Sequence, residues 1–146
     1  MIFELRLVIF KSKDVLEAVD IKKHVLREIV NCLPPYADMV VSARSAIHYN
    51  LHDLYFIAIV VDIKSSIGMP FKSISKFSQA LFDYIMNNRS SIKGTLFLCM
   101  ATGKCTQYGT SKMSDSDAAI VFNVENSVNK IADFIGFNPS QGRLRF

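Results

Sequence analysis

The longest apolar run without a charged residue, LYFIAIVV, covers residues 54–61. β-Branched and aromatic residues dominate it, and the run is too short to cross a bilayer. A run of this kind is typical of a strand that is covered on both faces of a sheet. The pattern therefore predicts a central strand over residues 54–63, which the chain enters through a turn at 50–53.

Apolar residues alternate with Glu4 and Arg6 near the start of the chain. Phe3, Leu5 and Leu7 fall on one face of an extended segment, which predicts a half-buried strand over 2–10. Residues 15–19 fit either a short strand or the beginning of a helix. Further strand patterns occur at 39–50, 95–101 and 118–124, and the first of these is expected to form an antiparallel hairpin with 54–63.

Apolar residues recur with the 3.6-residue period of a helix in three stretches, 21–33, 71–86 and 126–135. Asp20 is the expected N-cap of the first helix, and Pro34 and Pro35 are expected to end it. Gly136 is expected just beyond the third helix. The polar stretches 64–70 and 102–116 are predicted to be loops, the second of them mobile.

These elements predict a single domain over residues 1–146 of the α+β class. Its mainly antiparallel sheet of about five strands packs with about three helices. A doubly wound parallel sheet is disfavoured, because such a sheet needs a crossover helix between successive strands and only one link contains a clear one.

Composition narrows the class of protein but not its function. Half of the residues are hydrophobic and 21% are charged, so disorder is not expected outside the ends. The net charge of +4 would help the protein approach an acidic protein, a phosphate backbone or an anionic membrane. We expect no signal peptide at the start, where Glu4 and Arg6 interrupt the apolar run, and the chain contains only three cysteines. Reduced thiols and a cytoplasmic location are therefore predicted.

The residues that most often carry chemistry form no recognisable active site. His48 and His52 have the spacing H-x₃-H, but they lie in a predicted strand and turn without a third ligand. Cys99 and Cys105 are too far apart for a zinc knuckle, and we expect a core thiol and a loop thiol. Nucleophile-elbow and phosphate-loop motifs are absent. We therefore expect no catalytic activity, cofactor or metal.

Three segments together resemble the longin, or SNARE-like, domains, and most of all the clathrin-adaptor small chains. They are ELRLVIFKS near the start, residues 46–85 with their LYF run followed by an amphipathic helix, and residues 117–137 with Phe-Asn before a helix. The chain departs from the family at 90–114, where the family has a short connection. Between Lys11 and Asp20 the family's second strand is hard to find.

The resemblance implies a non-enzymatic protein–protein interaction module, a longin-like subunit of a vesicle-trafficking or adaptor complex. Its partners would be other protein subunits and, indirectly, a membrane surface, in a hetero- or homo-oligomer. The contact surface implied by the resemblance comprises Tyr49, His52, Tyr55 and Lys72.

Two other functions stay open. The basic pI of about 9.0 and the tail residues Arg143 and Arg145 suggest a small RNA-associated α+β protein. An enzyme could also assemble its site from dispersed residues, with His48, His52, Asp53 and Cys105 as the candidates.

Overall fold

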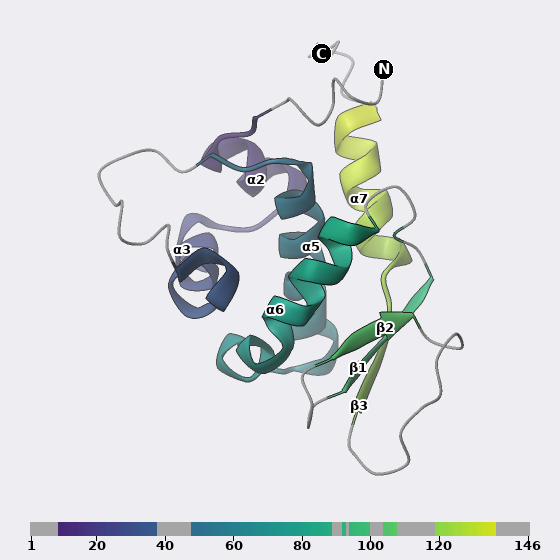
Figure 1. Ribbon diagram of the computed structural model, residues 1–146. Coiled ribbons are helices and arrows are strands. Elements are labelled where there is room, and N and C mark those ends of the chain that lie inside the picture. Colours follow the sequence, from purple (N-terminus) through teal and green to yellow (C-terminus); the bar gives the residue numbers. More distant parts are fainter. Residues whose placement is uncertain are drawn as a thin grey trace.

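The computed structural model describes residues 9–37, 48–88, 92, 94–99, 104–107 and 119–136. Within these segments the chain forms five α-helices, one short 3₁₀ helix and three β-strands, shown in Figure 1. In chain order they are α2 (Ser12–Val19), α3 (Lys23–Cys32), η1 (Pro34–Tyr36), α5 (Leu51–Ile67), α6 (Phe71–Asn87), β1 (Thr95–Cys99), β2 (Cys105–Gln107), β3 (Ala119–Asn123) and α7 (Glu125–Gly136).

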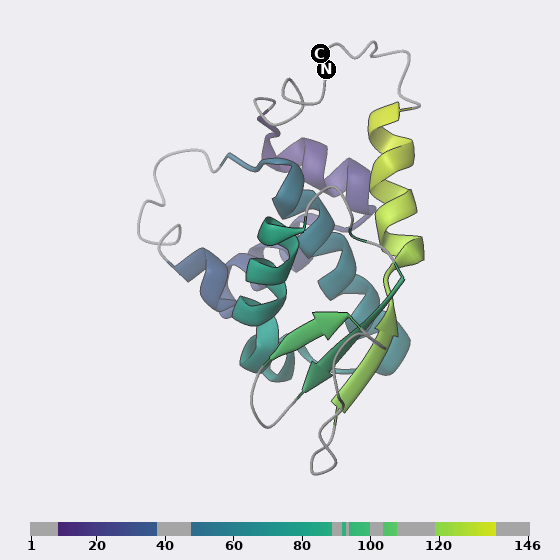
Figure 2. The same cartoon turned by 45° about the vertical axis from the view of Figure 1, so that its right-hand side comes forward.

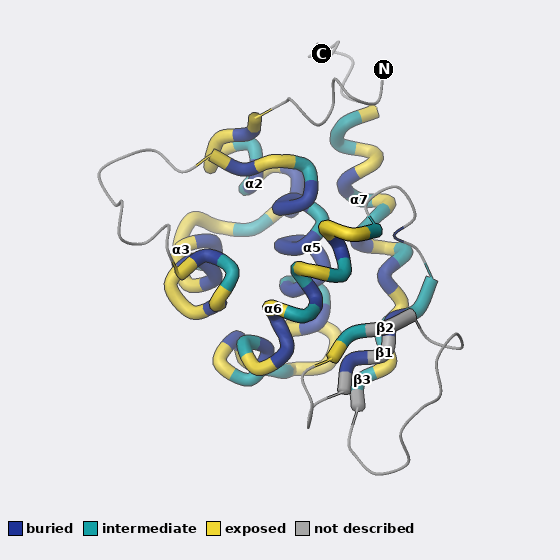
Figure 3. The backbone as a smooth tube through the Cα atoms, in the orientation of Figure 1, coloured by how far each residue is buried: buried dark blue, intermediate teal, exposed yellow. Residues whose placement is uncertain are grey.

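The central element is the helix α5, so the strand predicted for residues 54–63 is wrong. Figure 3 shows α5 buried along most of its length, and every residue from Phe56 to Val60 is fully buried. A helix that is apolar on all sides belongs in the interior of a protein. A continuous apolar run has no periodicity, and therefore fits a buried helix as well as a buried strand.

Local signals at both ends of α5 agree with the helix. At its N-terminus the Asn50 side chain accepts a hydrogen bond from the Asp53 backbone N–H, 3.1 Å away, and the Asp53 carboxylate accepts one from the Asn50 N–H at 2.9 Å. This reciprocal pair caps the helix. The predicted turn at 50–53 is thus the helix cap and first turn. The helix continues to Ile67, and Gly68 ends it in the left-handed conformation with φ +81°.

Helices α2, α6 and α7 all pack against α5. Only residues 68–70 separate α5 from α6, so α6 runs back along α5, as Figures 1 and 2 show. Helix α6 has the predicted amphipathic pattern and turns one apolar face to the core. The fully buried members of that face are Phe71, Ile74, Phe77, Leu81 and Ile85.

The described strands form one three-stranded antiparallel sheet in the order β2-β1-β3. Leu96 and Leu98 of β1 are fully buried, and α6 contacts both β1 and β2. The strands predicted at 95–101 and 118–124 are confirmed by β1 and β3. Part of the predicted loop 102–116 is also a strand, because β2 lies within it.

The predicted fold class is therefore wrong. The described residues form five α-helices with a three-stranded sheet, instead of about five strands with about three helices. The main cause is the central run, which is helical. The strands predicted at 2–10 and 39–50 lie mostly outside the described residues. Within them, Phe10 and Tyr49 form an isolated antiparallel bridge with N···O distances of 2.7 and 2.8 Å.

The N-terminal helices refine three further predictions. Residues 15–19 belong to helix α2 and not to a strand. Asp20 ends α2 with φ 64° and does not begin α3, whose N-cap is Lys22. Helix α3 ends at Cys32, shortly before Pro34, as the prolines predict. The helices predicted at 71–86 and 126–135 are confirmed by α6 and α7.

Polar contacts connect α7 to the rest of the bundle. The buried Ser127 hydroxyl donates a hydrogen bond to the Asp62 carboxylate of α5. The Lys130 ammonium lies 3.9 Å from the same carboxylate and donates to the Val19 carbonyl at the end of α2, 3.4 Å away. A cation is favourable at a helix C-terminus, where backbone carbonyls lack partners. These contacts fix α7 against both α5 and α2.

Candidate functional site

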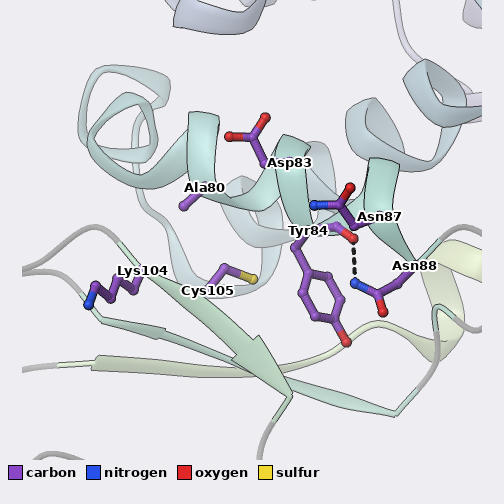
Figure 4. Close-up of a pocket in the computed structure, with 7 residues that line it drawn as sticks. All are labelled: Ala80, Asp83, Tyr84, Asn87, Asn88, Lys104 and Cys105. Carbon is purple, nitrogen blue, oxygen red and sulfur yellow. Dashed lines mark hydrogen bonds between the residues drawn. The ribbon is translucent and has the colours of Figure 1, made fainter.

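A shallow groove of about 370 Å³ lies between the C-terminal half of α6 and the start of β2. Figure 4 shows the side chains that line it. They are Ala80, Asp83, Tyr84, Asn87 and Asn88 from α6 and its end, and Lys104 and Cys105 from the β2 side. We refer to this feature as the α6–β2 groove.

On the α6 side, the lining residues of the groove share one stripe of the helix surface. Ala80, Asp83, Tyr84 and Asn87 are spaced i, i+3, i+4 and i+7, which puts them on one stripe of the helix surface. This stripe flanks the buried face of α6. At the end of the helix the Asn88 side-chain amide donates a hydrogen bond to the Tyr84 carbonyl, 2.8 Å away. Asn87 and Asn88 are therefore two neighbouring amides at this end of the groove, and among the described residues only Asn88 is seen to bond back to the helix.

On the sheet side, the pairing of β1 with β2 determines the position of Cys105. Cys105 lies opposite Leu98 in the antiparallel pair of β1 and β2, and its half-buried side chain packs against the core. Burial raises the pKa of the Cys105 thiol to about 12. The thiol is therefore protonated at neutral pH, and a protonated thiol is a poor nucleophile.

Tyr84 adds a neutral hydroxyl to the groove. Its pKa is raised above the usual range of tyrosine, first by burial and then by the neighbouring Cys105. Asp83 is exposed and accepts a hydrogen bond from the Gln79 amide at 3.1 Å. The groove thus offers a carboxylate, an ammonium group, a phenol and side-chain amides, all of which can bind without reacting.

A second polar cluster lies inside the protein, at the N-terminus of α5. The Tyr36 hydroxyl donates to one oxygen of the buried Asp53 carboxylate at 2.8 Å, and the Asn50 backbone N–H donates to the other at 2.9 Å. Burial raises the pKa of Asp53, although both hydrogen bonds and His52 act to lower it. Burial also raises the pKa of Tyr36, with Asp53 as the second cause.

Aromatic rings pack around Tyr36, one member of this cluster. The Tyr36 ring makes edge contacts with Tyr49, Phe56 and Phe82, at centroid distances of 6.5, 5.8 and 6.1 Å. Only 5% of Asp53 is exposed to solvent, and low exposure strengthens the hydrogen bonds that its carboxylate accepts. The cluster joins η1 to the cap of α5 and so has a structural role.

The structure does not bring the four predicted contact residues together on one surface. Tyr49 and His52 are buried near the start of α5, and Tyr55 is half-buried. Lys72 is exposed at the start of α6, about one length of α5, or roughly 25 Å, away. Burial removes Tyr49 and His52 from any surface that a partner could contact.

The candidates for a dispersed active site are also separated. His48 is exposed before α5, whereas His52 and Asp53 are buried in its first turn. Cys105 lies in β2, on the sheet side of the α6–β2 groove. In the segments that the structure describes, His, Cys, Asp and Glu residues form no group of three or more that could hold a metal ion.

Sequence reasoning missed the groove. It identified the buried face of α6 but not the flanking stripe with Tyr84 and Asn87, although the spacing of that stripe is visible in the sequence. It also placed Cys105 in a mobile loop. Only strand pairing moves Cys105 next to α6.

Acidic and basic residues nearly balance within the described segments, so most of the net charge of +4 belongs to residues outside them.

No described helix combines the length and apolar character needed to cross a bilayer. In comparisons with protein families, curated proteins and solved structures, nothing matches the chain.

Proposed function

We propose that this protein is a non-enzymatic interaction module that binds a segment of a partner protein in the α6–β2 groove. The observation that carries the proposal is the composition of the groove. It combines Asp83 and Lys104, two opposite charges, with the hydroxyl of Tyr84 and the amide of Asn87. Its thiol, Cys105, is kept protonated by burial.

These groups suit the recognition of a polypeptide. A side-chain amide such as that of Asn87 can donate to and accept from one peptide unit. A tyrosine such as Tyr84 offers both an apolar ring and a hydroxyl, and tyrosines are enriched where proteins meet. Opposite charges in one groove select a segment with complementary charges.

The proposal retains only part of what the family resemblance implied. The resemblance depended on a strand that begins with LYF, and this stretch lies in α5. A role in vesicle traffic therefore has no support from the fold. The alternative of RNA binding depended on Arg143 and Arg145, which lie outside the described residues. Within the described segments acidic and basic residues nearly balance, so these segments add no support for RNA binding.

The proposal can be tested by selecting a random peptide library, displayed on phage, against the immobilised full chain. The peptide with the highest affinity would be synthesised with a fluorophore, and its binding would be measured by anisotropy. We expect the groove variants Asn87→Ala and Lys104→Ala each to lower the affinity about fivefold or more, as truncation of a central contact does.

Lys76→Ala is the matched control, because Lys76 is exposed on α6 and does not line the groove. It should leave the affinity within about twofold. If selection yields no binding peptide, or if both groove variants bind the selected peptide as well as the wild type does, the proposal is wrong.

A further inference from the structure

Strand β2 lies at an edge of the described sheet. Among the described strands it pairs with β1 alone. In Figures 1 and 2 the strands follow one another from β2 through β1 to β3, with β2 nearest to α6. The Cys105 side chain lines the groove and packs against the core, so α6 lies over the face of the sheet beside this edge. The outer edge of β2 is thus close to the α6–β2 groove, and an edge strand carries backbone N–H and C=O groups that can pair with another segment.

Three polar side chains of the groove have no hydrogen-bond partner among the described residues. They are the Tyr84 hydroxyl, the Asn87 amide and the Lys104 ammonium group. Asp83 differs, because its carboxylate already accepts from Gln79. The groove thus places Lys104, which can only donate, and two groups that both donate and accept, Tyr84 and Asn87, next to a strand edge. A segment that supplies acceptors, and above all a carboxylate near Lys104, would complement it.

From this juxtaposition we infer that the α6–β2 groove binds an extended segment with an acidic side chain, which adds to the edge of β2 as a further strand. The inference rests on the proposed function and specifies its ligand. Backbone pairing supplies affinity, and the side chains of α6 and Lys104 supply specificity. Since β2 has three residues, it spans about 10 Å and can pair with about three or four residues of the segment.

Strand addition makes a specific prediction for the peptide obtained by phage selection. In a sheet, only alternate residues direct their N–H groups toward the neighbouring strand. Methylating one backbone nitrogen of the peptide at a time should therefore lower its affinity about tenfold at every second central position. Methylation at the positions between them should change the affinity by about twofold or less.

The acidic side chain is tested by a double-mutant cycle. Replacing the acidic residue of the peptide by its amide should lower affinity for the wild type about fivefold, but should have little effect on binding to Lys104→Ala. The variant Lys76→Ala serves as the control and should respond as the wild type does. Equal losses with wild type and Lys104→Ala would overturn the pairing of Lys104 with a carboxylate.

The outcomes separate the inference from the proposed function. A peptide that binds through the groove but shows no alternation on methylation would overturn strand addition and leave the binding module intact. Failure to select any peptide would overturn both. If light scattering shows that the wild type dimerises, and an excess of the selected peptide separates the dimer, the natural occupant of the edge is a second copy and the inference is wrong.

Discussion

The Asp53 carboxylate is the clearest case in which a single residue shapes the protein. It is buried and has two hydrogen-bond donors, but no cation forms an ion pair with it among the described residues. Burial therefore outweighs the hydrogen bonds, and the pKa of Asp53 is raised. A buried charge of this kind costs free energy. It persists because the same carboxylate caps the central helix.

The raised pKa predicts how stability depends on pH. Between about pH 4, the ordinary pKa of an unfolded aspartate, and the raised pKa, folded Asp53 holds a proton that the unfolded chain has lost. The free energy of unfolding contributed by Asp53 is therefore highest below this window and falls as the pH rises through it. Urea unfolding of the wild type and of Asp53→Asn should show a stability difference that declines with pH in this window.

Tyr36→Phe provides the matched comparison. The substitution removes a hydrogen bond that lowers the pKa of Asp53, so the pKa should rise further. The loss of unfolding free energy with pH should then continue to a higher pH than in the wild type. It should also lower the free energy of unfolding at neutral pH by about 1.5–3 kcal/mol. Parallel pH curves for the wild type and Asp53→Asn would contradict the raised pKa.

The Cys105 thiol is the group of the α6–β2 groove that would be the strongest nucleophile if it were ionised, and we expect it to be unreactive. With a pKa of about 12, only about one thiol in ten thousand is ionised at pH 8. We expect iodoacetamide to alkylate Cys105 at least about tenfold more slowly than the exposed Cys32. Peptide mapping by mass spectrometry would give both rates in the same sample. Comparable rates for the two thiols would show that the groove contains a reactive thiolate.

At the scale of elements, the central helix shows how caps and burial cooperate. The interior of α5 contains β-branched residues such as Ile57, Ile59 and Val60, which favour strands slightly. The capping pair at Asn50 and Asp53 and the left-handed Gly68 favour the helix. Packing of α2, α6 and α7 around α5 removes its apolar side chains from water. Burial on this scale outweighs the small differences in propensity.

Two glycines at helix ends allow a test of the α5 boundary. A Cβ atom at either Gly68 or Gly136 would meet nothing within 4 Å, but only Gly68 has a positive φ, +81°. Gly68→Ala should lower the free energy of unfolding by about 1 kcal/mol, because an L-residue is strained in this conformation. Gly136→Ala should be neutral or slightly stabilising. Urea denaturation measures both, and equal effects would contradict the left-handed end of α5.

For the whole molecule, the arrangement predicts a gradient of local stability. Helix α5 is surrounded by other elements, whereas α3 has one face on the core and an exposed face that includes Arg27 and Glu28. Amide exchange reflects how easily each part of a protein opens. Hydrogen–deuterium exchange followed by mass spectrometry should find the slowest amides in α5, with those of α3 exchanging faster. Exchange in α5 as fast as in α3 would contradict its central position.

The sequence alone was sufficient to predict the type and approximate bounds of those elements that have one apolar face. The periods of α6 and α7 and the apolar character of β1 and β3 are local, because each element turns one face to the core and the other away. Helix stops such as Pro34 act through local backbone geometry as well. The signals for the ends of α5, Asn50, Asp53 and Gly68, are also local, but they were interpreted as a turn at 50–53 and a loop at 64–70 because the run between them was taken for a strand.

The tertiary structure alone decided the state of the central run and the location of the groove. A stretch that is buried on all sides shows no alternation between polar and apolar faces, so its period carries no information. Its neighbours determine whether it is a helix or a strand. The groove joins Tyr84 and Asn87 of α6 to Lys104 and Cys105 at β2. These residues are distant in the chain and meet only because β2 pairs with β1 beneath the same helix.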